Sequence, residues 1–120
     1  MGIDIYARWR NQSEDEEQAQ FTGFSLAHGH VGYLRESYGG TPFATHVLVP
    51  EAFASDSGQA TIPAATLRSR LPGAIATCRE RYEGNAEVTE TAVKSLEDFV
   101  ALCERKEEET GEPCVIIASY

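Results

Sequence analysis

The sequence has no apolar run near the ~18 residues that a membrane-spanning helix needs. Cysteine is scarce: there are three, with no Cys-x-x-Cys pair, so neither a disulfide framework nor a zinc ribbon is predicted. Basic residues are also few, since Lys and Arg total 10 against 19 Asp and Glu, a formal net charge of −9. This charge repels phosphate groups and argues against binding to nucleic acid or to an anionic membrane surface.

The composition is that of one ordinary globular domain. The chain has 120 residues, 42% of them hydrophobic and 24% charged, and we expect a single domain over residues 1–120. The first ten residues include Asp4, Arg8 and Arg10, unlike a secretory leader. The cysteines lie among apolar neighbours, as small buried side chains do in a reducing compartment. We therefore expect a cytoplasmic protein.

The first half of the chain alternates like β-structure. Ile3, Ile5 and Ala7 share one parity and Asp4 and Tyr6 the other, which predicts a strand over residues 3–9 with one buried face. The polar residues 11–20 predict a solvated loop, and residues 21–34 a hairpin or bent strand. Residues 43–49 predict a further strand, closed by Pro50, and residues 54–61 a connection.

The second half changes to helical spacing. A stripe beginning at Leu67 predicts helix up to Gly84, either as two short helices or as one helix kinked at Pro72. Ser95 and Asp98 resemble a capping box for a further helix, which could also begin earlier, near Thr89 or Thr91, and which ends at Gly111. Residues 114–118 predict a strand beside the first one. This order indicates an α+β fold: one two-layer domain, a mainly antiparallel sheet with two to three helices on one face.

Three stretches, MGIDIYA, GYLRESYGGTPFAT and GEPCVIIASY, carry a resemblance to a group of proteins. They resemble small uncharacterised bacterial and phage-associated proteins that begin MGIDIY. The resemblance covers most of the chain. It implies a protein of unknown function and assigns no catalytic residue.

The segment from Tyr33 to Gly40 is the most site-like part of the sequence. Tyrosine and arginine are enriched at binding hot spots, and glycine lets a backbone approach a ligand closely. On a strand, positions 33, 35 and 37 face one way and positions 34 and 36 the other. The alternative is a solvated strand face followed by a tight turn, with Arg35 paired to a neighbouring acid. The candidate residues for binding a ligand or partner are Tyr33, Arg35, Glu36, Tyr38, Gly39, Gly40 and His46.

Binding rather than catalysis is the leading expectation, with no cofactor and with a protein or small molecule as partner. The sequence is also compatible with a homodimer, since an exposed sheet edge invites pairing. A rival hypothesis is a zinc-dependent hydrolase in which His28, His30 and His46 hold the metal, with Asp4 or Glu36 as a carboxylate ligand. Ordinary exposed or hydrogen-bonded histidines are the alternative to that site. No catalytic residue and no metal ligand is assigned.

A third hypothesis is an acidic inhibitor or immunity-type protein. It would use the run Glu14-Asp15-Glu16-Glu17 against a basic partner, and its only support in the sequence is the net charge. Such a run also serves simply to keep a small protein soluble.

Overall fold

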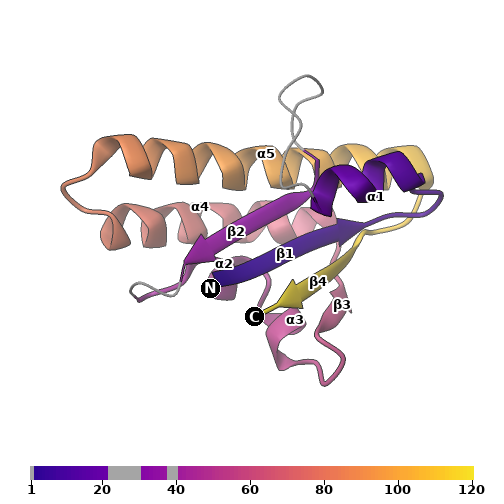
Figure 1. Cartoon of the computed structure of the whole chain (residues 1–120), viewed down its shortest axis with the longest axis horizontal. Helices are drawn as coiled ribbons and strands as arrows, with labels where there is room; N and C mark the ends of the chain where they lie inside the picture. The colour runs from indigo at the N-terminus through magenta and orange to yellow at the C-terminus, as the bar shows by residue number, and fades with distance from the viewer. Residues whose placement is uncertain (1, 22–30, 38–40) are drawn as a thin grey trace.

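The computed structural model describes residues 2–21, 31–37 and 41–120, and in them a four-stranded antiparallel sheet in the order β2-β1-β4-β3 (Figure 1). Five helices accompany it. The elements in chain order are β1 (Gly2–Arg8), α1 (Glu14–Phe21), β2 (Tyr33–Ser37), α2 (Ala44–Leu48), α3 (Pro50–Ala54), β3 (Gln59–Thr61), α4 (Ala64–Arg81), α5 (Ala86–Thr110) and β4 (Val115–Ser119).

The sheet has one buried face, as the alternation predicts. Ile3, Ile5 and Ala7 are buried on β1, whereas the residues between them are half-buried on the other face. The last strand, β4, pairs with β1 along the register Ile5↔Ala118, so the two ends of the chain lie together at the centre of the sheet (Figure 1). The prediction of a core strand beside the first one is therefore confirmed.

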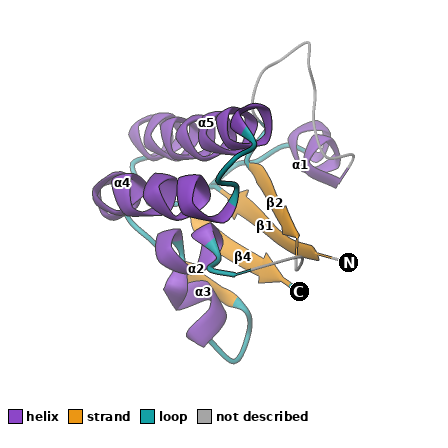
Figure 2. Cartoon of the chain, turned by 90° about the vertical axis from the view of Figure 1, so that its left-hand side faces the viewer, coloured by secondary structure: helices purple, strands orange, loops and turns teal. Residues whose placement is uncertain are grey.

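The helices α4, α5 and α2 lie on the buried face of the sheet (Figure 2). Phe99 of α5 and Leu67 of α4 are fully buried in one core with Ile116 of β4. The predicted α+β class is confirmed, with more helices than the two to three expected. None of the helices in the described part of the chain is long and apolar enough to cross a membrane.

The loop predicted over residues 11–20 is wrong, because Glu14–Phe21 forms α1. Ser13 Oγ accepts a hydrogen bond from the Glu16 N–H at 3.1 Å, and the Glu16 carboxylate accepts one from the Ser13 N–H at 2.9 Å. This reciprocal pair is a capping box, and the acidic first turn of α1 suits the helix dipole. Polar composition concealed a helix that is stabilised at its N-terminus.

The strand predicted over residues 43–49 is also wrong, because Ala44–Leu48 is α2 and α3 follows from Pro50. Its buried residues are Ala44, Thr45 and Leu48, which is helical rather than alternating spacing. The predicted connection over residues 54–61 contains the short strand β3.

The two long helices are simpler than predicted. The helix α4 runs unbroken from Ala64 to Arg81, with Pro72 exposed inside it, so the two-helix alternative is wrong. The helix α5 begins well before Ser95, at a cap where the Asn85 side chain accepts from the Val88 N–H at 3.2 Å. It ends at Gly111, whose φ of 77° is left-handed as predicted for a terminating glycine.

Candidate functional site

Four polar and aromatic side chains gather on the face of the sheet that α4 and α5 do not cover. Asp4 and Tyr6 come from β1, and Tyr33 and Arg35 from β2; we call them the outer-face cluster. The register sets Asp4 opposite Arg35 and Tyr6 opposite Tyr33. Strand alternation places all four on one face, while Leu34 on the other face is buried in the core.

Asp4 is the acceptor at the centre of the outer-face cluster. Its Oδ1 atom accepts a hydrogen bond from the Tyr33 hydroxyl at 2.5 Å and one from Arg35 Nη1 at 3.2 Å. The Arg35 side chain is 54% exposed and that of Asp4 21%. The guanidinium is thus oriented by Asp4 and still open to an additional acceptor.

The two tyrosines give the outer-face cluster an aromatic side. Their ring centroids lie 5.2 Å apart, and Tyr6 is 6.0 Å from Phe21 at the end of α1, whose side chain is 59% exposed. Burial, followed by the hydrogen bond to Asp4, raises the pKa of Tyr33 above its ordinary value. Burial and the charge of Asp4 raise the pKa of Tyr6 in the same way. Both phenols therefore stay protonated at neutral pH.

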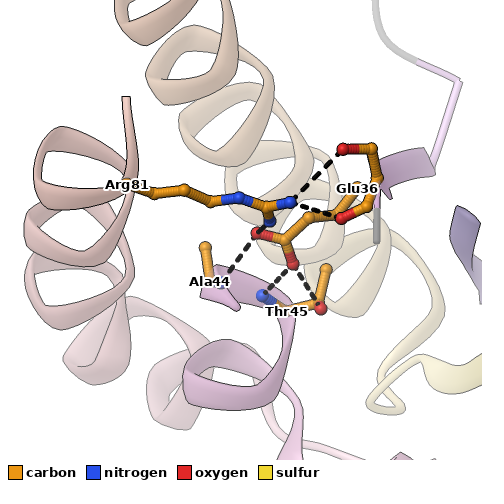
Figure 3. A network of polar contacts seen from close by, with 5 residues as sticks. Glu36, Ala44, Thr45 and Arg81 are labelled. Carbon is orange, nitrogen blue, oxygen red and sulfur yellow. Dashed lines mark hydrogen bonds and ion pairs between the residues drawn. The ribbon is translucent and has the colours of Figure 1, made fainter. Parts of the chain in front are cut away.

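Glu36 lies on the other face of β2 and is not brought together with Arg35. Its Oε2 accepts from the Ala44 N–H at 2.8 Å (Figure 3). Its Oε1 accepts from the Thr45 N–H at 2.9 Å and the Thr45 hydroxyl at 2.6 Å. The side chain of Arg81, 4% exposed, forms an ion pair with Glu36 Oε2 at 2.9 Å. These contacts occupy both carboxylate oxygens, so Glu36 holds α2 against the sheet.

Arg81 was not anticipated from the sequence, and it connects three elements. Its Nη2 donates to the Ser37 carbonyl, and its guanidinium lies over the rings of Phe43 at 5.1 Å and Tyr82 at 5.3 Å. The Nη1 atom makes no hydrogen bond of regular geometry, so its contact with Glu36 is a charge contact. A signal for this partner was present, because a glutamate at an inward strand position requires compensation.

His46 lies with the helices and not with the outer-face cluster. It belongs to α2, not to the predicted strand, and its ring stacks on Phe53 at 3.9 Å and lies 5.2 Å from Phe43. Phe53 in turn is 5.2 Å from Tyr120. The structure therefore places His46 and Arg35 on opposite sides of the sheet.

The remaining predicted residues fall outside the described ranges. These are Tyr38, Gly39 and Gly40 of the candidate segment and His28 and His30 of the metal hypothesis. Among residues 2–21, 31–37 and 41–120, no group of three His, Cys, Asp or Glu side chains could hold a metal ion.

Half of the acidic run at the start of α1 is engaged within the molecule. Glu17 pairs with Arg8 at 2.9 Å, and Glu16 pairs with Lys106 at 3.4 Å. Glu16 also belongs to the capping box. Two of the four acidic side chains proposed to face a basic partner thus have a structural role.

Comparison of the chain with protein-family models, with curated proteins and with solved structures found no match. The functional argument therefore depends on the geometry of the outer-face cluster.

Proposed function

We propose that this protein acts by binding, in the cytoplasm, and that the outer-face cluster is the centre of its binding surface. The observation that carries the proposal is the half-exposed guanidinium of Arg35, held by Asp4 beside two tyrosine rings on the sheet face that α4 and α5 do not cover. Arginine and tyrosine provide directional donors and rigid contact area, the features of binding hot spots. The cytoplasmic location rests on three unpaired, buried cysteines.

Binding suits this geometry better than catalysis. Both tyrosines hold their protons at neutral pH and Asp4 is occupied as an acceptor, so neither a phenolate nor a free carboxylate base is provided. The cluster instead offers donors and aromatic faces. We infer that the partner is a protein, because the flat face of a sheet contacts an extended surface more readily than it encloses a small molecule.

The test uses a library of random peptides displayed on phage and selected on the immobilised protein. Peptides recovered in this way should lose about tenfold or more in affinity with Arg35→Ala and with Tyr33→Ala, since central anchors typically contribute more than about 1.4 kcal/mol.

Two matched substitutions serve as controls. Arg79→Ala removes an arginine of similar exposure, 56%, from α4, and Tyr120→Ala removes a tyrosine that is 65% exposed. Both should leave the affinity of the selected peptides unchanged. Equal losses from Arg35→Ala and Arg79→Ala would show that the peptides bind elsewhere and would overturn the proposal.

A further inference from the structure

Among the described residues, the strand β2 forms one edge of the sheet and pairs with β1 alone. The Ala7 N–H donates to the Gly32 carbonyl at 2.8 Å, which makes this a hydrogen-bonded pair of the antiparallel ladder. Hydrogen-bonded and non-hydrogen-bonded pairs alternate along two antiparallel strands. The next residue of β2 that is hydrogen-bonded to β1 is therefore Leu34. The N–H and C=O groups of Tyr33 and Arg35 therefore point away from β1. No strand within the described ranges pairs with them (Figure 1).

A small cavity lies next to this edge, between β2 and the helices. Its volume is about 40 Å³, and it is partly open. Leu34 lines it from the sheet, Ala92 and Ser95 from α5, and Cys78 from α4. The carboxylate of Glu36 also borders the cavity but is already fully hydrogen-bonded. The cavity therefore has room for one small apolar side chain.

We propose that the partner adds an extended segment to β2 as a fifth strand, with a small apolar side chain such as alanine or valine in the cavity. This inference rests on the proposed function and names the class of its partner. In strand addition the backbone hydrogen bonds provide affinity, and pockets for alternate side chains provide specificity. Successive side chains of the added strand point to opposite faces of the sheet, so the neighbours of the cavity residue lie on the same face as the outer-face cluster. A carboxylate is expected there, since Arg35 opposite an acid is a favourable cross-strand pair.

A second copy of this chain fits the edge poorly. Paired through its own β2, the copy would present Leu34 or Glu36 beside the cavity, and both are larger than the alanine or valine expected there. Symmetric pairing centred on Arg35 also sets this arginine opposite itself, and like charges directly opposite destabilise a strand pair. A foreign segment with small apolar residues on either side of an acid meets neither obstacle.

The backbone part of the proposal is tested with peptides selected from the phage library. Arg35→Pro removes the outward N–H without touching the hydrogen bonds to β1, whereas Arg35→Ala removes the side chain alone. Arg35→Pro should reduce the affinity for the peptides about tenfold more than Arg35→Ala does. Should the proline variant fail to fold, N-methylation of each peptide amide in turn replaces it. Losses at alternate amides support strand addition, and a pattern without alternation overturns it.

The cavity is tested by filling it. Ala92→Leu should abolish binding of the selected peptides, whereas Ala101→Leu, on the exposed side of the same helix, should leave it unchanged. The peptides should carry a small apolar residue at the position next to an acid. Unchanged affinity in Ala92→Leu would overturn the strand proposal.

The failure of this inference differs from the failure of the proposed function. If Arg35→Ala reduces the affinity for the peptides but Arg35→Pro reduces it no further, the outer face binds the peptides without strand addition. If Arg35→Ala has no effect, the binding surface itself is wrong. A dimer in sedimentation that dissociates with Arg35→Pro would overturn the proposal by making a second copy the occupant of the edge.

Discussion

Glu36 of β2 and Arg81 at the end of α4 form an ion pair at 2.9 Å between side chains that are 7% and 4% exposed. Glu36 also accepts hydrogen bonds from both amides at the start of α2, and Arg81 donates to the Ser37 carbonyl. The pair thus fixes the end of β2 to both α2 and α4 (Figure 3). Because β2 provides Tyr33 and Arg35, this buried contact supports the surface proposed to bind.

Breaking this pair should destabilise the protein strongly. Arg81→Met leaves the Glu36 carboxylate buried without its cation, and removal of one partner of a buried pair costs about 3–5 kcal/mol. Urea unfolding measures the change in the free energy of unfolding. Arg79→Met on the same helix removes an exposed arginine and should cost less than about 1 kcal/mol. Equal losses in the two variants would show that the buried pair has no special role.

The capping box of α1 should be detectable as local stability. Ser13→Ala removes the acceptor for the Glu16 N–H, and loss of an N-cap costs about 1 kcal/mol. Hydrogen exchange of the α1 amides should accelerate about fivefold, while exchange in α5 stays the same. Ser69→Ala on α4, whose hydroxyl donates to the Thr66 carbonyl, is the control. Unchanged exchange in α1 would contradict the role of Ser13 as a cap.

Acid should weaken the contact between α3 and α4. The paired hydrogen bonds from Arg70, at 2.6 and 2.8 Å, lower the pKa of Glu51 below its ordinary value of 4.5. A lowered folded-state pKa means that this stabilisation is present at neutral pH and is lost as the pH falls below about 4.5 through the folded-state value. Glu51 is 44% exposed, so the effect is below about 1 kcal/mol.

Comparison of two glutamine variants isolates this contribution. Glu51→Gln should reduce the loss of stability between neutral and acidic pH, measured by thermal melts. Glu108 is exposed at the end of α5, so Glu108→Gln should leave the loss of stability between neutral and acidic pH unchanged. The account fails at this point if both variants follow the wild-type profile.

The cysteines should be unreactive in the folded protein. All three are buried, and burial followed by the charge of Glu36 raises the pKa of Cys78 to about 11. The hydrogen bond with Cys114, followed by burial, also raises the pKa of Cys103. The same hydrogen bond lowers the pKa of Cys114, which is protected by its burial. Native protein at neutral pH should therefore not be alkylated by iodoacetamide, whereas denatured protein should be labelled at three positions, as mass spectrometry will show. Rapid native labelling of Cys78 would contradict its burial.

Elements with strong apolar periodicity could be predicted from the sequence, and short polar elements could not. Alternation identified β1 and the inward position of Leu34, because side-chain parity follows directly from strand geometry. Residues 43–49 were wrongly predicted as a strand because β-branched residues favour strands. The helix α2 that forms there depends on Glu36, which accepts hydrogen bonds from its first two amides. That contact is tertiary and leaves no local pattern.

The candidate site was predictable in part for the same reason. Parity alone separates Tyr33 and Arg35 from Glu36, and the structure places them on opposite faces of β2. The association of Arg35 with Asp4 depends on strand order and register, which the sequence does not specify. The position of His46 could not be predicted from the sequence either, since it depends on α2 being a helix.

The affinity of library-selected peptides for the Arg35→Ala and Arg79→Ala variants tests the central claim most directly. Urea unfolding should first show that both variants keep their stability to within about 1 kcal/mol, because both arginines are exposed. The account predicts that Arg35→Ala loses about tenfold or more in affinity and that Arg79→Ala loses none. Wild-type affinity in Arg35→Ala would contradict the assignment of the outer-face cluster as the binding surface.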